Sequence, residues 1–245
     1  YKRQIYIYRQ PGKEFINKMK ISCMKGKLMQ GISNVSKAVS TKTTHPILSC
    51  IFIEAENGNI KLTANDMEIG IESYVEGTVI EEGKVAIEAK LLSDIVRKLP
   101  DSEIHMETNE DFKTTIKCEK SLFTIAGKSG EDFSSLPVVE KSKYITISQF
   151  TLREIINQTI FSISDSEYNN VMTGELFEVS NNRLRVVAID GHRIAIRNVE
   201  LKDESQDVKV IVPGKALSYI SKIVNGGVDD DVNIYFADNL SLIHI

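Results

Sequence analysis

The sequence predicts an α+β protein of two tandem domains, each a duplicated β-α-β-β-β unit with two helices packed on antiparallel sheets. The first observation behind this fold class is an internal repeat. Residues 48–66 align with residues 172–190, and residues 85–95 align with residues 210–220, at shifts of 124 and 125. The second is a series of short runs in which apolar and polar residues alternate, which predicts more strands than helices. Helices in such a protein bury their apolar faces on a sheet.

The first domain is expected to contain the unit twice. Leu28, Ile32 and Val35 recur at helical spacing, which predicts a helix over about 25–39. Asn57-Gly58 is typical of a hairpin turn between two strands. The expected order is strand 19–22, helix 25–39 and strands 48–55, 60–64 and 68–75, then strand 84–88, helix 90–99 and strands 103–108, 113–118 and 121–126.

The second domain repeats this order and stops at least one strand short of completing it. We place the first domain at 19–137 and the second at 144–245, with 1–18 as an N-terminal extension. The expected elements are strand 145–148, helix 151–163 and strands 172–179, 183–189 and 193–199, then strand 208–212, helix 214–223 and strand 232–236.

Composition predicts a cytoplasmic protein with no membrane partner. The N-terminus lacks the apolar core of a signal peptide, no apolar run reaches the length of a membrane span, and the three cysteines have no CxxC spacing. The net charge of −4 argues against nucleic acid, but the charges are segregated. No acidic residue occurs between Phe15 and Ile53 or between Val208 and Val228, so the chain can still present a basic face.

An enzymatic function has little support in the sequence. No GxxxxGK[ST] or GxGxxG motif is present to bind a nucleotide, and the four histidines lack a zinc-binding spacing. We therefore expect no cofactor and no metal. A Cys-His dyad built on Cys23 or Cys50 stays open at this point, although both cysteines lie in apolar contexts typical of a core.

Five motifs, in order along the chain, resemble a single family. They are VSKAVSTKTTHPILSCIFIEAENGNIKLTANDMEIGIE (35–72), KLLSDIVRKLP (90–100), EDFSSLP (131–137), AIDGHRIA (188–195) and VIVPGKAL (210–217). All are similar to the bacterial DNA polymerase III beta subunit, the replication sliding clamp, from about Met19 to about Asn239. The resemblance implies tandem DNA-clamp domains, three per chain, with two chains closed head-to-tail into a ring that has no catalytic activity.

In this family, helices line the hole of the ring and face duplex DNA, and the clamp tethers the polymerase. The family's DNA-contacting positions fall on Lys42 and Arg97, and the loop 164–170 matches another DNA-facing segment. The other cations of the repeated helical layer would add sequence-independent attraction to phosphates. The expected DNA-facing set is Lys37, Lys42, Arg97, Lys98, Arg153, Lys215 and Lys222. The implied partners are duplex DNA, the DNA polymerase III alpha subunit, the clamp loader and other clamp-motif proteins.

The resemblance also places a pocket for short hydrophobic partner peptides on the second domain, at its boundary with the third. The matching positions are Met172, Ile189, Gly191, His192, Arg193 and Ile194. The change of repeat shift from 124 to 125 after Asp190 agrees, because it predicts one extra residue at Gly191-His192-Arg193 and an enlarged turn. Met172 and Ile194 would supply apolar contacts, and His192 and Arg193 polar ones. The alternative for Asp190-Gly191 is a plain hairpin turn.

The family's dimer contact corresponds here to the last strand of the first domain, with Ser121, Phe123 and Ile125. That strand pairs with a third domain, which this sequence lacks. Two expectations stay open: a fragment of a clamp that forms a homodimer when complete, which the incomplete second repeat favours, or a two-repeat protein that closes as a trimer. A function of another class also stays open, namely a two-repeat peptide-binding adaptor that does not encircle DNA.

Overall fold

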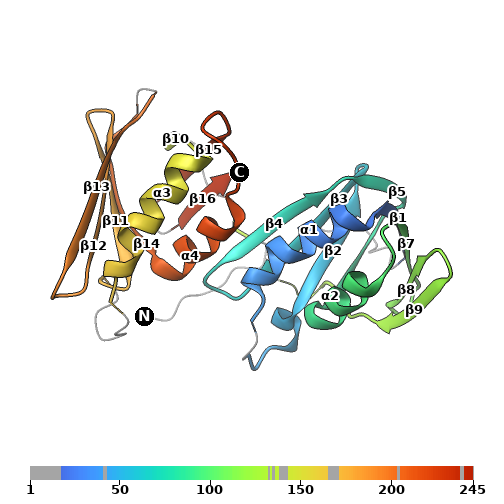
Figure 1. Ribbon diagram of the computed structural model, residues 1–245. Helices are drawn as coiled ribbons and strands as arrows, with labels where there is room; N and C mark the ends of the chain where they lie inside the picture. Colours follow the sequence, from blue (N-terminus) through green and yellow to red (C-terminus); the bar gives the residue numbers. More distant parts are fainter. Residues whose placement is uncertain are drawn as a thin grey trace. The chain divides into compact units, whose positions relative to one another are not determined.

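The computed structural model describes residues 18–40, 43–131, 133, 136–137, 143–164, 171–202, 205–237 and 240–244 (Figure 1). The chain separates into two compact units, Tyr1–Leu136 and Pro137–Ile245. We call them the first and second domains and describe each by itself.

Two antiparallel sheets and two helices make up the first domain. The helices α1 (Lys25–Val35) and α2 (Ala89–Lys98) lie side by side (Figure 1). The sheets have the orders β5-β1-β7-β8-β9 and β4-β3-β2-β6. The strands are β1 (Met19–Met24), β2 (Cys50–Glu56), β3 (Asn59–Asn65), β4 (Gly70–Val75), β5 (Gly77–Glu81), β6 (Gly83–Glu88), β7 (Glu103–Thr108), β8 (Lys113–Cys118) and β9 (Ser121–Ala126).

The two halves of the first domain exchange their first strands. β1 leads into α1 but pairs with β7 of the second half, and β6 leads into α2 but pairs with β2 of the first half. The expected β-α-β-β-β order is therefore present twice and is spread over two sheets. β5 is an additional strand, paired with β1. A Cβ on Gly77 would lie 2.4 Å from the Ser22 carbonyl oxygen, so only glycine allows this close approach.

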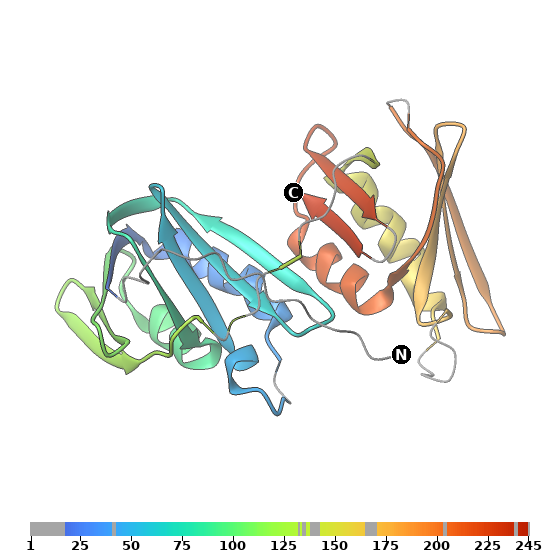
Figure 2. The same ribbon diagram turned by 180° about the vertical axis from the view of Figure 1, so that it is seen from behind.

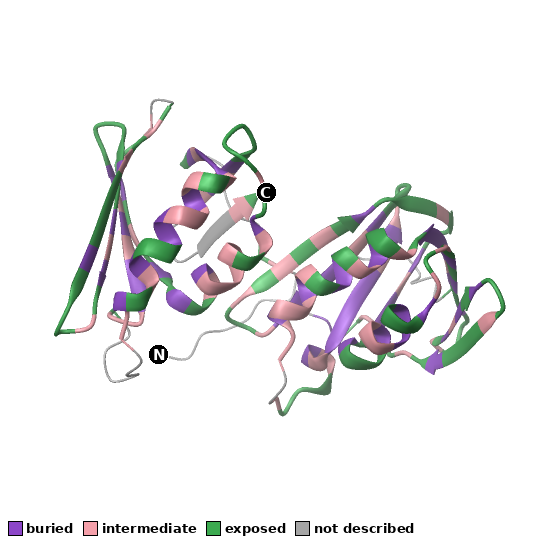
Figure 3. Ribbon diagram, in the orientation of Figure 1, coloured by how far each residue is buried: buried purple, intermediate pink, exposed green. Residues whose placement is uncertain are grey.

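The helices of the first domain pack on its core through apolar side chains that lie on one face of each helix. Leu28, Ile32 and Val35 of α1 are fully buried, whereas the opposite side of the helix is exposed (Figure 3). α1 is shorter than expected, because Ser36–Ala38 continue as a 3-10 turn. α2 begins after Glu88, whose carboxylate accepts a hydrogen bond from the Leu91 amide at 3.1 Å.

The second domain repeats this plan with its own pair of adjacent helices, α3 (Gln149–Thr159) and α4 (Gly214–Ile223). Its sheets have the orders β13-β12-β11-β14 and β10-β15-β16 (Figures 1 and 2). A 3-10 turn, η3 (Ile160–Ser162), follows α3. The strands are β10 (Tyr144–Ser148), β11 (Gly174–Ser180), β12 (Arg183–Ile189), β13 (Ile194–Glu200), β14 (Val208–Pro213), β15 (Asp231–Ala237) and β16 (Leu240–His244).

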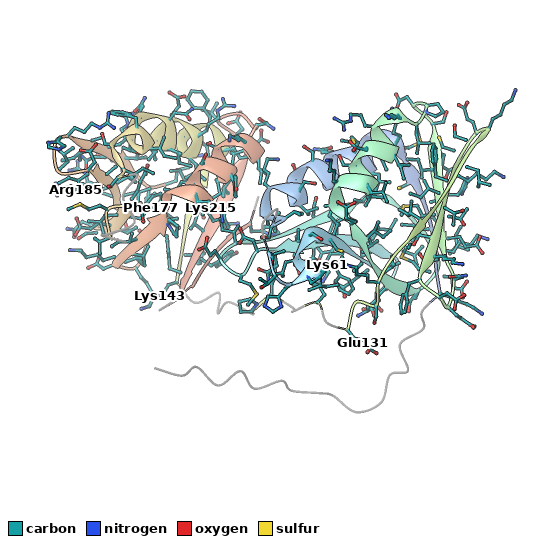
Figure 4. All side chains as sticks on the ribbon, turned by 90° about the horizontal axis from the view of Figure 1, so that it is seen from below. Lys61, Glu131, Lys143, Phe177, Arg185 and Lys215 are labelled. Atoms are coloured by element: carbon teal, nitrogen blue, oxygen red, sulfur yellow. The ribbon has the colours of Figure 1, made fainter. Side chains whose placement is uncertain are left out.

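The two domains share one strand register, which shows that the sequence repeat is also a structural repeat. In the first domain Phe52 pairs with Thr63 and Ala86, and in the second Leu176 pairs with Val187 and Ile211. These pairs are related by the shifts of 124 and 125 found in the sequence. Each domain has its own core, and Phe177 lies in the interior of the second (Figure 4).

Candidate functional sites: a basic helical layer and an exposed hairpin

The four α-helices reverse the charge balance of the chain. The whole chain has 34 acidic and 30 basic residues. The helices instead contain eight basic residues and only two acidic ones, Asp94 and Glu154. The basic residues are Lys25, Lys27, Lys90, Arg97, Lys98, Arg153, Lys215 and Lys222.

Two of these basic positions are duplicated between the domains. Lys90 and Arg97 of α2 correspond to Lys215 and Lys222 of α4 at the shift of 125. The members of each pair are seven residues apart, which places them on the same helix face. All four side chains are exposed, and Figure 4 labels Lys215 on α4. Both domains thus carry a two-cation stripe on their second helix.

The expected DNA-facing residues fall into three groups in the structure. Arg97, Lys98, Lys215 and Lys222 are exposed on α2 and α4. Lys37 and Arg153 are half-buried: Lys37 Nζ donates to the Ser33 carbonyl at 2.9 Å, and the Arg153 guanidinium lies 6.0 Å from the centre of the Phe150 ring. Lys42 and loop residues 165–170 lie outside the described residues. Arg97 also pairs with Asp94, so part of its charge is already neutralised.

The expected peptide site is built on the turn between β12 and β13. The Asp190 carboxylate fixes this turn: Oδ1 accepts from the amides of His192 at 3.0 Å and Arg193 at 3.1 Å, and Oδ2 accepts from Arg193 Nε at 2.7 Å. The His192 amide, followed by the Arg193 side chain, lowers the pKa of the Asp190 carboxyl. Gly191 has φ +91°, a conformation that favours glycine.

The expectation of an extra residue in this turn is wrong. In the first domain Asn65 pairs with Gly70, and in the second Ile189 pairs with Ile194, so four residues separate the strands in both. The Asp66 carboxylate of the first domain makes the same bonds, accepting from the Glu68 amide at 3.0 Å and the Ile69 amide at 2.8 Å.

The register change occurs later, after β4 and β13. The stretch from Val75 to Gly83 contains β5. Its counterpart from Val199 to Val208 is one residue longer, and its described residues between β13 and β14 form no strand. The two turns therefore differ only in their side chains. Met67, Glu68 and Ile69 of the first domain stand where the second has Gly191, His192 and Arg193.

The structure brings most of the expected pocket residues together. Ile189 and Ile194 are cross-strand partners and are 40% and 58% exposed, next to the exposed His192. Met172 lies just before β11, and its carbonyl accepts from the Ser164 amide at 2.8 Å. Phe161 of η3 was missed: its ring is 56% exposed and lies 5.9 Å from the Arg193 guanidinium.

A buried carboxyl group lies near the start of β11, at the second residue of the strand. Glu175 is fully buried, and its Oε2 accepts from the Thr159 hydroxyl at 2.9 Å. Its Oε1 has no hydrogen-bond partner in the part of the chain that the structure describes, and neither has the buried Ser162 hydroxyl. Burial raises the pKa of the Glu175 carboxyl to about 7.

The three residues expected at a dimer contact differ in accessibility. β9 is the edge strand of its sheet, and Phe123 is 40% exposed on it. Ser121 is half-buried, whereas Ile125 is buried in the core of the first domain. Alternate residues of a strand share a face, so all three side chains point to the same side of β9, and of the three only Ser121 and Phe123 remain accessible there.

The cysteines do not form the dyad that the sequence leaves open. Cys23, Cys50 and Cys118 are buried, and burial raises the pKa of the Cys23 thiol to about 11. A thiol with this pKa stays protonated and unreactive at neutral pH. Within the described residues, no cluster of three metal-ligating side chains exists. None of the helices described has the length and apolarity of a membrane span.

Comparison with known proteins gives one consistent result. The family model of the DNA polymerase III beta subunit matches residues 19–137 with its N-terminal domain and 146–245 with its central domain. The beta sliding clamp of Staphylococcus epidermidis is 38% identical over 222 residues, which cover 87% of this chain and 59% of the relative. That of Halalkalibacterium halodurans is 36% identical over 225 residues, with the same coverage.

Comparison with solved structures leads to the same family. A putative DNA polymerase III beta subunit from Eubacterium rectale has a TM-score of 0.90 and 54% identity, over 92% of this chain and 61% of that one. The Bacillus subtilis sliding clamp has a TM-score of 0.89 and 31% identity, over 93% and 62%. A Pseudomonas aeruginosa sliding clamp bound to griselimycin has a TM-score of 0.83 and 28% identity, over 90% and 60%.

This chain therefore spans about 60% of the length of its relatives. Because the two family models together cover most of it, the chain belongs to the bacterial DNA polymerase III beta subunit family, the beta sliding clamps.

Proposed function

We propose that this chain acts as part of a DNA sliding clamp, the processivity factor of a replicative DNA polymerase. In this role it holds duplex DNA against its helices, does not read the base sequence, and performs no catalysis. The observation that carries the proposal is the reversed charge of the helical layer, with eight basic residues against two acidic ones in a chain of net charge −4.

The position of these cations suits a protein that must move along DNA. Lys90, Arg97, Lys215 and Lys222 lie on rigid helices at repeated positions, so the charge is distributed evenly over both domains. Contacts of lysine and arginine with phosphates are independent of sequence and sensitive to salt. A sliding protein gains nothing from base-edge contacts, which would hold it at particular sequences.

The test is DNA binding by a pair of matched double variants. Arg97→Ala with Lys222→Ala removes one duplicated cation from each helical stripe. Arg183→Ala with Lys209→Ala removes the same charge from β12 and β14, where both residues are exposed and paired with glutamates. We expect the helix variant to bind two duplexes of unrelated sequence more weakly and equally so, and the sheet variant to bind like the parent. Equal losses in both variants would exclude the helical layer as the DNA-binding face.

We further propose that Met172, Ile189, Gly191, His192, Arg193 and Ile194 bind partner peptides of the DNA polymerase III alpha subunit, the clamp loader and other clamp-motif proteins. The Asp190 bonds support this, because they hold the Arg193 side chain beside two exposed isoleucines. Griselimycin, bound by the Pseudomonas aeruginosa relative, provides a probe. Calorimetry should show weaker griselimycin binding to His192→Ala with Arg193→Ala than to the parent. Unchanged affinity would contradict this placement of the site.

In a complete clamp, the accessible edge of β9 with Ser121 and Phe123 would contact the partner chain of a homodimeric ring in the cytoplasm. The exposed Phe123 ring at an unpaired strand edge supports this role. The DNA experiment also distinguishes the clamp from a peptide-binding adaptor that does not encircle DNA. An adaptor should bind griselimycin and show no salt-dependent affinity for duplexes.

A further inference from the structure

One face of the four-stranded sheet of the second domain is turned away from α3 and α4 (Figures 1 and 2). A row of apolar side chains on that face is partly or largely exposed. One residue comes from each strand, and the strand register places them side by side: Ile196, Val187, Leu176 and Ile211. We call these four the outer apolar row. Ile196 and Ile211 are 45% and 43% exposed, and the other two are half-buried.

Three of the four counterparts of this row in the first domain are buried, and the fourth, Glu72, is an exposed residue paired with Lys61. Glu72, Thr63, Phe52 and Ala86 occupy the same register positions. Thr63 is 3% exposed, Phe52 9% and Ala86 0%. A stretch of the chain lies across Phe52 and Ala86. That stretch follows β9, the last strand of the first domain. We call the described residues of this stretch, 127–131, 133 and 136–137, the covering segment.

The covering segment is held by backbone bonds, an aromatic stack and close packing. Lys128 and Ala86 exchange two backbone hydrogen bonds, of 3.0 and 2.8 Å, at the open edge of β6. The Phe133 ring stacks on Phe52 with 4.9 Å between ring centres. Gly130 passes so close that a Cβ there would lie 2.0 Å from the Phe52 ring. The first domain thus shows what covers this face of the sheet.

The second domain repeats the sheet without a cover in the described residues. Ile211 stands at the position of Ala86 on the edge strand β14, and none of the described residues bonds to its outward side. Leu176 stands at the position of Phe52. An apolar row beside an open strand edge is the combination that receives an added extended segment.

We infer that the outer apolar row binds an extended segment of the same kind as the covering segment. This segment forms backbone hydrogen bonds with the open edge of β14 at Ile211, and it has an aromatic ring that packs on Leu176. In the first domain the cover directly follows the domain's last strand, so we assign the same origin here: the stretch that follows the second domain in longer clamp chains. The relatives are long enough for this, since the chain covers only 59% of the curated ones.

One difference limits how closely the occupant resembles the covering segment. Leu136 rests against Gly70, where a Cβ would lie 2.1 Å from its Cδ2. The counterpart of Gly70 is Ile194, whose side chain fills that space. The occupant therefore follows the covering segment over Leu176 and Ile211 and departs from it near Ile194.

The test uses the 245-residue chain and a synthetic peptide of residues 127–137, GKSGEDFSSLP. Hydrogen exchange with and without peptide reports on the Ile211 amide, and a labelled peptide gives the affinity. We expect saturable binding at peptide concentrations up to about 1 mM, the weak end of specific affinities. The Ile211 amide should become protected, and replacing the phenylalanine of the peptide by alanine should abolish both effects.

Two protein variants locate the bound peptide. Ile211→Asp should abolish binding. Asn198→Asp adds the same charge to the same face of the sheet, but on β13, and should leave binding unchanged. Binding that is lost with His192→Ala and kept with Ile211→Asp would overturn the inference, because the peptide would then sit on the hairpin site. Absence of binding would overturn it too.

Sedimentation of the chain alone tests the main competing occupant. If the outer apolar row pairs with a second copy of the chain, the chain should form a dimer that Ile211→Asp dissociates, and that result would overturn the assignment to an extended segment. The inference predicts that the parent and Ile211→Asp sediment alike. None of these outcomes depends on DNA binding, so the proposed function and this inference can fail separately.

Discussion

Replacing Glu175 by glutamine tests the physical reading of the buried carboxyl group. In the folded chain burial raises its pKa from an ordinary value of 4.5 to about 7. Between these pH values the folded chain binds more protons than the unfolded chain, so stability falls as the pH rises through this window. Below pH 4.5 both states are protonated, and no stability is lost.

The magnitude follows from the size of the shift. Each pKa unit corresponds to about 1.4 kcal/mol, so the full loss is about 3 kcal/mol, and about 2.5 kcal/mol of it falls between pH 5 and pH 8. Glutamine cannot ionise and still accepts the Thr159 hydrogen bond. The stability of Glu175→Gln relative to the parent should therefore increase by about 2.5 kcal/mol from pH 5 to pH 8.

Urea unfolding at pH 5, 6, 7 and 8, followed by circular dichroism because the chain has no tryptophan, measures this difference. Glu178→Gln is the matched control. It lies on the same strand but faces outward, 3.4 Å from Lys209. The reasoning is refuted if the difference in stability between Glu175→Gln and the parent is the same at all four pH values.

Three further perturbations test other parts of the structure. Gly77→Ala should destabilise the first domain by about 2 kcal/mol or more, because its Cβ would meet the Ser22 carbonyl oxygen. A midpoint equal to that of Gly26→Ala, an exposed glycine of α1 with open space around it, would contradict this. Asp190→Ala should increase hydrogen exchange of the His192 and Arg193 amides, whereas unchanged exchange would show that the carboxylate does not hold the turn. Phe133→Ala should lower the free energy of unfolding of the first domain by about 3 kcal/mol, because the stack on Phe52 is lost. A loss of stability no larger than that of Phe150→Ala, at an exposed position of α3, would refute the role of the covering segment.

Much of the fold could be predicted from the sequence because its signals are local. The helix at 214–223 and the strand at 183–189 occur at the expected residues, since apolar periodicity and turn residues define both ends. The exchange of β1 and β6 between sheets could not be predicted, because it depends on pairing between distant segments. β5 was missed for a related reason: most of its residues are exposed, and its approach to β1 depends on Gly77.

The site was predicted in part. The resemblance indicated the residues of the hairpin, but the alignment shift was assigned to the wrong stretch, because a shift shows that a residue was inserted without showing where. Phe161 carried no signal, since the apolar pattern places it in a helix over 151–163. Glu175 interrupts an apolar strand, and its buried position emerged only from the packing of Thr159 against β11.

The salt dependence of DNA binding tests the central claim most directly. The logarithm of the affinity for a duplex should fall linearly with the logarithm of salt concentration, and each phosphate contact removed should reduce the slope by about 1. We predict that Arg97→Ala with Lys222→Ala reduces the slope by about 2, and that Arg183→Ala with Lys209→Ala leaves it unchanged. A slope that is the same in the parent and both variants would contradict the claim that the helices of this chain face DNA.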